Sequence, residues 1–164
     1  MTRVLAVVGN PRAESRTHLI ARTLADEIAR ATAGNVEPEV DLAAFGARVL
    51  DHADAEVAAA AERLAAADVL VVASPTYKAT YSGLAKAFLD RVPTGGLRGA
   101  RAVPVLLGGA PDHRLAVDVH FAPLLLELGA RTPARGLFVL ESELDDFPAL
   151  ARAWSAEHAA ALAH

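Results

Sequence analysis

Two arginines and two hydroxyl residues stand together after the first apolar run of the chain, and side chains of these types bind phosphate. The apolar run at residues 4–8 ends at Gly9-Asn10-Pro11, and a helical pattern begins near Ser15. A helix N-terminus offers free backbone N–H groups and the positive end of its dipole, which favour an anion. The side chains expected to add donors are Arg12, Ser15, Arg16 and Thr17. The alternative is that Ser15 only caps the helix and that both arginines are solvated.

Two further loops carry groups that suit a flat heterocycle. Residues 74–83 follow the clearest apolar run and contain both tyrosines of the chain, Tyr77 and Tyr81. Residues 108–113 begin with two glycines, whose lack of a Cβ atom lets the backbone approach a ring closely. Each loop also has a plain interpretation: the tyrosines could fill the core or an oligomer contact, and Lys78 could be a solvated charge.

Side chains for acid–base, nucleophilic or metal chemistry are not grouped in the sequence. The chain has no cysteine, its six histidines lack metal-ligand spacing, and the motifs GxSxG, GxxxxGK[ST] and GxGxxG do not occur. The acidic stretch at residues 141–146 has no basic partner nearby in sequence, so we expect a solvated loop there. We predict no catalytic side chain and no metal ligand, and we favour a bound cofactor that performs its own chemistry.

The elements between the three loops must bring them together. Apolar runs alternate with helical patterns in the order βαβαβαβαβα. This order predicts a three-layer α/β sandwich with a five-stranded parallel sheet, strand order 2-1-3-4-5. In such a sheet the loops after strands one, three and four meet at the carboxyl edge, where ligands bind. The predicted strands are residues 4–8, 36–42, 69–73, 102–107 and 136–140, and helices are expected to begin near residues 15, 54, 82, 112 and 148.

Single residues make these predictions specific. Pro38 places residues 36–42 at an edge of the sheet, and Pro104 is expected near the start of its strand, because proline donates no ladder hydrogen bond. Asp54 and Ser82 are the predicted N-caps of the second and third helices. Gly34 is the predicted C′ residue of the first helix, and Pro123 predicts a kink in the fourth.

Length and composition limit the class of protein. The chain has 164 residues and a mass of 17.1 kDa, the size of one domain covering residues 1–164. Its formal net charge is −4 and it lacks a Lys/Arg-rich stripe, so we expect no nucleic-acid partner. No apolar run approaches the roughly 20 residues of a membrane span, and residues 1–8 are too short for a secretory signal. We therefore expect a cytoplasmic protein without a membrane partner.

The combination of loops resembles the NAD(P)H-dependent FMN reductases over nearly the whole chain. Gly9-Asn10-Pro11-Arg12 followed by Ser15-Arg16-Thr17 resembles their phosphate loop. Residues 74–84 (SPTYKATYSGL) and 86–90 (KAFLD) are similar to their second flavin loop and the helix after it, and Gly108-Gly109 and residues 124–130 and 134–140 also match. The pattern is most similar to the reductases of two-component alkanesulfonate monooxygenase systems.

The resemblance implies a flavodoxin-like fold and a homodimer or homotetramer that binds FMN at the three loops. The implied phosphate contacts are Arg12, Ser15, Arg16 and Thr17 with Asn10 beside them, and the implied ring contacts are Pro75, Thr76, Tyr77, Lys78, Gly108 and Gly109. The implied activity is hydride transfer from NAD(P)H to FMN, with reduced flavin supplied to a partner monooxygenase.

Three other functions stay open at this point. The chain could hold FMN tightly and reduce a quinone, an azo dye or a metal oxyanion. It could be a non-enzymatic flavodoxin-type electron carrier, although the TxTGxT-like phosphate loop of such carriers is missing. It could also be a partner-binding domain that has lost its ligand, against which Arg12, Ser15 and Arg16 argue.

Overall fold

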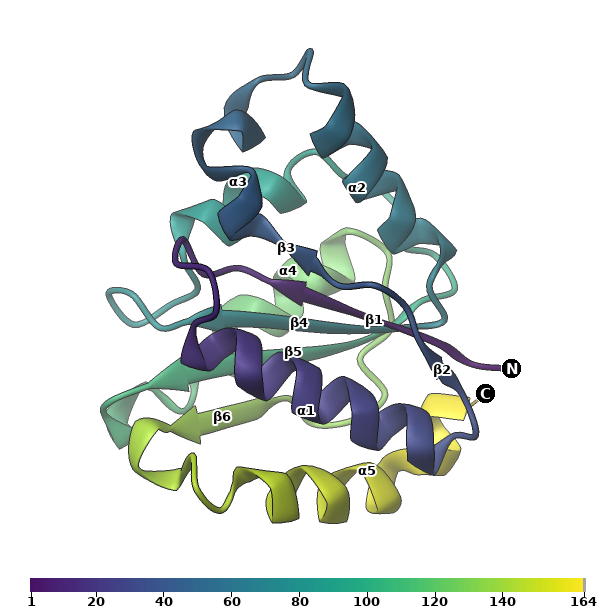
Figure 1. Cartoon of the computed structure of the whole chain (residues 1–164), viewed down its shortest axis with the longest axis vertical. Coiled ribbons are helices and arrows are strands. Elements are labelled where there is room, and N and C mark those ends of the chain that lie inside the picture. Colours follow the sequence, from purple (N-terminus) through teal and green to yellow (C-terminus); the bar gives the residue numbers. More distant parts are fainter. Residues whose placement is uncertain (164) are drawn as a thin grey trace.

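A parallel sheet runs through the middle of the molecule and carries helices on both faces in the computed structural model, which describes residues 1–163 (Figure 1). The order β2-β1-β4-β5-β6 confirms the predicted order 2-1-3-4-5, with β3 as an additional partner of β1. The strands are β1 (Arg3–Val8), β2 (Asn35–Val36), β3 (Val40–Asp41), β4 (Val69–Pro75), β5 (Arg101–Gly108) and β6 (Leu137–Leu140).

The edge strand next to β1 consists of two short pieces instead of the single strand predicted at residues 36–42. Both β2 and β3 pair in parallel with β1, at Val4↔Val36 and Val7↔Val40. Pro38 lies between them and has no N–H group for the ladder, so pairing stops and resumes. The edge position is confirmed, and the break explains why six strands occupy five positions.

Alternate side chains of the buried strands enter two separate cores. Val4, Ala6 and Val8 pack on the face covered by α1 (Arg16–Ala31) and α5 (Phe147–Ala163). Leu5 and Val7 pack on the opposite face, which carries α2 (Ala55–Ala66), α3 (Gly83–Leu89) and α4 (Ala122–Glu127) (Figure 1). Because both faces are covered, residues 4–8, 69–73 and 102–107 of these strands are all apolar, as the sequence indicated.

The predicted N-caps are confirmed, whereas the predicted end of the first helix is off by one residue. Asp54 accepts from the backbone N–H groups of Glu56 and Val57, and Ser82 accepts from that of Ala85. At the end of α1 it is Ala33, with φ of 50°, that adopts the left-handed conformation predicted for Gly34. The Gly34 N–H donates to the Ala29 carbonyl, and a Cβ atom on Gly34 would lie 2.3 Å from the Thr2 carbonyl oxygen. Position 34 therefore requires glycine because the Thr2 backbone lies close to it, and not because its φ is positive.

Pro104 stands in the middle of β5 instead of near its start. The neighbouring Ala102 N–H points toward the β6 side, since it donates to the Arg131 carbonyl at 2.7 Å. The Pro104 nitrogen faces the same side, because alternate residues of a strand bond to the same neighbour. Pairing with β6 begins only at Val105↔Leu137, so no ladder donor is needed at residue 104.

The predicted helix at residues 112–128 forms as three pieces. A 3₁₀ turn covers Pro111–His113, a π-helical turn covers Val117–Phe121, and α4 follows directly. Pro123 lies in the first turn of α4, where a missing N–H costs little. A π-helical turn lies just before Pro123, where the kink was predicted.

No helix among residues 1–163 combines the length and apolar character needed to cross a membrane.

Candidate functional site

A cavity of about 480 Å³ opens at the carboxyl edge of the sheet. It lies where the loops after β1, β4 and β5 meet, as the strand order predicted. Its volume falls in the range of about 300–1,000 Å³ that small-molecule sites occupy. Ten of the eleven residues predicted for the site line it: Asn10, Arg12, Ser15, Arg16, Thr17, Pro75, Thr76, Tyr77, Gly108 and Gly109.

The first loop leaves the N-terminus of α1 open toward the cavity. Ser15 caps the helix by accepting from the His18 N–H at 3.2 Å, so this part of the plain interpretation is confirmed. The first turn of α1 contains no acidic residue. The N–H groups of Arg16 and Thr17 precede the first intrahelical hydrogen bond and remain available to an anion.

Asn10 shapes this loop from within. Its Oδ1 accepts from the Arg12 N–H at 2.9 Å, and its Nδ2 donates to Thr17 Oγ1 at 3.0 Å. Asn10 and Thr17 are both buried. Asn10 thus joins the turn to the first helical turn and holds Arg12 and Thr17 at the cavity wall.

The two arginines of the loop differ in their partners. Within residues 1–163, no ion pair joins Arg12, whose side chain is exposed. Arg16 Nη2 donates to Glu141 Oε1 at 2.9 Å, so Arg16 is not simply solvated. Both arginines line the cavity and place positive charge beside the N-terminus of α1.

The loop after β4 supplies a polar atom that has no partner. Thr76 N–H donates to the Leu107 carbonyl at 2.7 Å, which ties the loop to β5. Thr76 Oγ1 is buried and makes no hydrogen bond within the described part of the chain. A buried hydroxyl without a partner at a cavity wall is suited to a ligand that supplies one.

Gly108 and Gly109 form the wall next to Thr76. A Cβ atom on Gly108 would lie 2.6 Å from Phe138 Cζ and 3.1 Å from Thr76 Oγ1. A Cβ atom on Gly109 would meet nothing within 4 Å. The first glycine is therefore required by packing, and the second leaves open space beside the cavity.

Lys78 is the predicted site residue that does not line the cavity. Tyr77 and Thr80 exchange backbone hydrogen bonds of 2.8 and 3.2 Å, and Lys78 and Ala79 between them have φ values of 51° and 64°. This is a tight turn with two positive φ angles, a conformation that is strained for residues other than glycine. The turn directs Lys78 into solvent, while Tyr77, 46% exposed, remains at the cavity rim.

Glu141 belongs to the site although the acidic stretch was expected to be a solvated loop. It directly follows β6 and lines the cavity, together with the other residues missed by the sequence analysis, Ala13, Glu14 and Leu107. The Leu140 N–H donates to Glu143 Oε2 at 3.0 Å, and Arg114 donates to its Oε1 at 3.1 Å. The Leu140 N–H, and then Arg114, lower the pKa of Glu143 below its ordinary value. Glu141 could have been predicted, because it directly follows the last predicted strand and the carboxyl ends of parallel strands lie at the same edge of a sheet.

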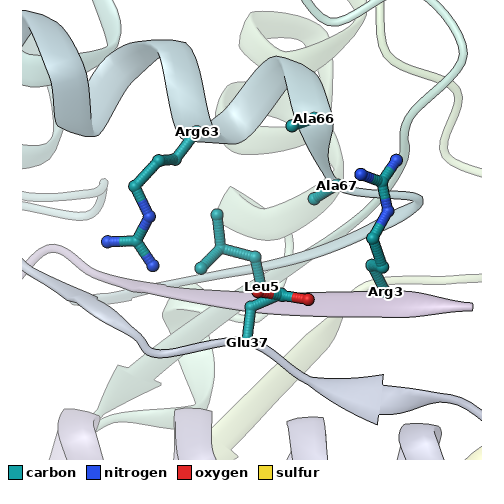
Figure 2. A pocket seen from close by; sticks show the side chains of 6 residues that line it. All are labelled: Arg3, Leu5, Glu37, Arg63, Ala66 and Ala67. Carbon is teal, nitrogen blue, oxygen red and sulfur yellow. The ribbon is translucent and has the colours of Figure 1, made fainter.

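A smaller cavity of about 100 Å³ lies between α2 and β1, near the amino end of the sheet (Figure 2). It is lined by Arg3, Leu5, Glu37, Arg63, Ala66 and Ala67. Both of its guanidinium groups have partners, since Arg3 pairs with Asp68 at 3.3 Å and Arg63 donates to the Pro38 carbonyl. None of the predicted site residues lies here.

Metal-ligand side chains do not gather anywhere in residues 1–163, where no group of three His, Cys, Asp or Glu side chains could hold a metal ion. His164, one of the six histidines, lies outside the described residues.

Two curated proteins and one solved structure are similar to most of this chain. It is 35% identical over 151 residues to the FMN reductase (NADPH) of Escherichia coli K12, covering 88% of this chain and 76% of that protein. It is 33% identical over 149 residues to an NADH-dependent FMN reductase (SfnF) of Pseudomonas putida, covering 87% and 80%. The apo structure of an NADH:FMN oxidoreductase (EMOB) matches with a TM-score of 0.87 at 28% identity, covering 98% and 90%.

A family model described as NADPH-dependent FMN reductase matches residues 2–145, which include every lining residue of the large cavity. The chain therefore belongs to the NADPH-dependent FMN reductase family.

Proposed function

We propose that this protein catalyses the NAD(P)H-dependent reduction of FMN. The observation that carries the proposal is the cavity at the carboxyl edge of the sheet. One end of it holds the N-terminus of α1 with Arg12 and Arg16, and the rest holds Thr76 and the two glycines at the end of β5. Such a site matches a ligand with a phosphate at one end and a flat polar ring at the other, and family membership identifies FMN as that ligand.

The phosphate end is formed by backbone and side-chain donors together. The N–H groups of Arg16 and Thr17 and the guanidinium groups of Arg12 and Arg16 would bind the phosphate oxygens. Charge-assisted hydrogen bonds contribute about 1.5–3 kcal/mol each, so three of them supply much of the roughly 8 kcal/mol that micromolar affinity requires. Asn10 would act by holding these donors in place, not by contacting the phosphate.

The ring end is formed by a narrow wall of mixed character. Pro75 and Leu107 supply apolar surface, Thr76 Oγ1 supplies an unpartnered hydroxyl, and Gly109 leaves room for a ring. FMN, when bound, supplies the isoalloxazine ring that accepts a hydride from NAD(P)H. The task proposed for this chain is to bind and orient the reactants, since the sequence predicts no catalytic side chain.

The partner, assembly and location are parts of the same proposal. A flavin-dependent monooxygenase that takes up reduced flavin is the proposed partner, supported by the similarity to the SfnF reductase. A homodimer or homotetramer is proposed, supported by the exposed side chains of Leu115, Val119 and Leu126 on one stretch of chain. The proposed location is the cytoplasm, where NAD(P)H is supplied.

An anaerobic stopped-flow experiment with NADPH, NADH and FMN tests the activity. We expect rapid oxidation of at least one nicotinamide nucleotide when FMN is added and none when flavin is omitted. Protein that neither binds FMN nor oxidises NAD(P)H in its presence would contradict the proposal. Gel filtration of the FMN-loaded protein then separates a reductase of diffusible FMN, which loses its yellow colour, from an enzyme that retains FMN.

A further inference from the structure

An ion pair between two distant parts of the chain lies in the wall of the large cavity. Arg16 Nη2 and Glu141 Oε1 are 2.9 Å apart, and the two side chains are 59% and 43% exposed. Arg16 is the first residue of α1, and Glu141 follows β6, on the far side of β4 and β5 in the sheet. The pair therefore joins the proposed phosphate end of the site to the turn after β6, the last strand of the sheet.

Glu141 presents negatively charged oxygen atoms to Arg16, as a phosphate would. A carboxylate and a phosphate both bind guanidinium through negatively charged oxygen atoms. A phosphate that uses Arg16 must displace the Glu141 oxygen or share the guanidinium with it. In either case two negative groups would face one another in the same cavity.

The backbone turn that carries Glu141 is held by its neighbours. Glu141 begins a 3₁₀ turn, Glu141–Glu143, whose last residue accepts hydrogen bonds from the Leu140 N–H and from Arg114. These contacts hold the backbone of the turn, which places Glu141 within reach of Arg16. Glu14 is a second carboxylate in the cavity lining, but no ion pair joins it to another side chain in residues 1–163.

We infer that Glu141 lowers the affinity of this protein for FMN by competing with the FMN phosphate for Arg16. The inference rests on the proposed function, because it concerns the same site. A flavin held less tightly exchanges faster, which suits an enzyme that releases reduced FMN to a partner. Glu141 would thus set whether FMN is a diffusible substrate or a retained group.

The test is the dissociation constant of FMN, measured by flavin fluorescence for the wild type and for Glu141→Gln. The variant keeps the size of the side chain and removes its charge. We expect FMN to bind about three- to tenfold more tightly, the range for loss of an exposed ion pair and of a like charge near the ligand. Riboflavin lacks the phosphate, so its affinity should not change. Glu141→Ala should show the same gain for FMN.

Glu62→Gln is the matched control, because it removes a negative charge from an exposed side chain outside the large cavity. We expect it to change FMN affinity less than about twofold. Equal FMN affinity in the wild type and both Glu141 variants would overturn the inference, as would an equal gain for riboflavin or for Glu62→Gln. Failure of the wild type to bind FMN would instead overturn the proposed function.

Discussion

Arg12 and Arg16 lie near one another in sequence but differ in their partners, because only Arg16 forms an ion pair within residues 1–163. Their substitution should therefore reduce FMN affinity by different amounts. Arg12→Ala removes a guanidinium without an ion-pair partner among residues 1–163, so FMN affinity should fall by about 1.5–3 kcal/mol. Arg16→Ala should cost about 1.5 kcal/mol, the lower end of that range, because Arg16 gives up Glu141 when it binds phosphate. Fluorescence titration with FMN measures both.

Arg135→Ala is the control for this pair, since Arg135 lies outside the large cavity and 3.6 Å from Asp118. It should leave FMN affinity unchanged. If Arg12→Ala and Arg16→Ala also left it unchanged, the two guanidinium groups would have no contact with the phosphate.

Gly108 and Gly109 are adjacent but should respond differently to an added methyl group. Gly108→Ala places Cβ 2.6 Å from Phe138 Cζ, so the free energy of unfolding should fall by about 1–3 kcal/mol. Gly109→Ala meets nothing within 4 Å, so stability should change by less than about 0.5 kcal/mol while flavin affinity falls. Urea unfolding and FMN titration of both variants test this, and an equal loss of stability would show that the wall is packed differently.

At the scale of elements, the N-cap of α3 also supports the phosphate loop. Ser82 Oγ accepts from the Ala85 N–H at 3.0 Å and donates to the Gly9 carbonyl, while a Cβ on Gly9 would lie 2.7 Å from Ala85 Cβ. Ser82→Ala removes the side-chain partner of the Ala85 N–H and of the Gly9 carbonyl. It should lower the free energy of unfolding by about 1–3 kcal/mol, and it should weaken FMN binding.

Asp54→Ala provides the comparison, because it removes the N-cap of α2, away from the cavity. It should cost about 0.5–2 kcal/mol of stability and leave FMN affinity unchanged. Urea unfolding with FMN titration distinguishes the two caps. Unchanged FMN binding in Ser82→Ala would show that the loop after β1 does not depend on α3.

At the end of α1, substitutions of two neighbouring residues should change the free energy of unfolding in opposite directions. Ala33 has φ of 50°, so Ala33→Gly should raise the free energy of unfolding by about 0.5–1 kcal/mol. Gly34→Ala should lower it, because the new Cβ would lie 2.3 Å from the Thr2 carbonyl oxygen. Thermal melting of both variants checks the signs, and stabilisation by Gly34→Ala would contradict the close approach.

At the scale of the whole molecule, four carboxylates should make folding sensitive to acid. Hydrogen bonds lower the pKa of Glu27 (chiefly from Arg30), of Asp54 (chiefly from Arg48), and of Asp68 and Glu143 (chiefly from the backbone N–H groups of Arg3 and Leu140). A carboxyl with a lowered folded-state pKa stabilises the fold above its unfolded pKa, and this contribution is lost as the pH falls through the folded pKa.

Thermal melting between pH 7 and pH 3 should therefore show a midpoint that decreases below about pH 4, the ordinary range of carboxyl pKa values. Glu143→Gln should make this decrease shallower, because one of the four groups no longer titrates. A melting temperature that rises with acidification would show that these pairs do not stabilise the folded state.

Much of the fold and of the site was predictable because local patterns determine them. Asp54 and Ser82 cap helices through contacts within three residues of themselves, so their roles follow from sequence. Pro104 was placed wrongly, because the absence of a neighbour on its N–H side depends on where β6 begins pairing. Lys78 was predicted in the site but lies outside the cavity, because the two positive φ angles of its turn direct it away.

The sequence by itself determined the strand order and the loops that meet at the carboxyl edge, since apolar runs alternating with helical patterns allow few other arrangements. It also determined the residue types at the N-terminus of α1. Only the tertiary structure decided which charges face one another. Arg16 and Glu141 are 125 residues apart in sequence, and their contact exists because the sheet brings the ends of β1 and β6 to one edge. Charge interactions depend on distance in space, so no local pattern could have revealed that pair.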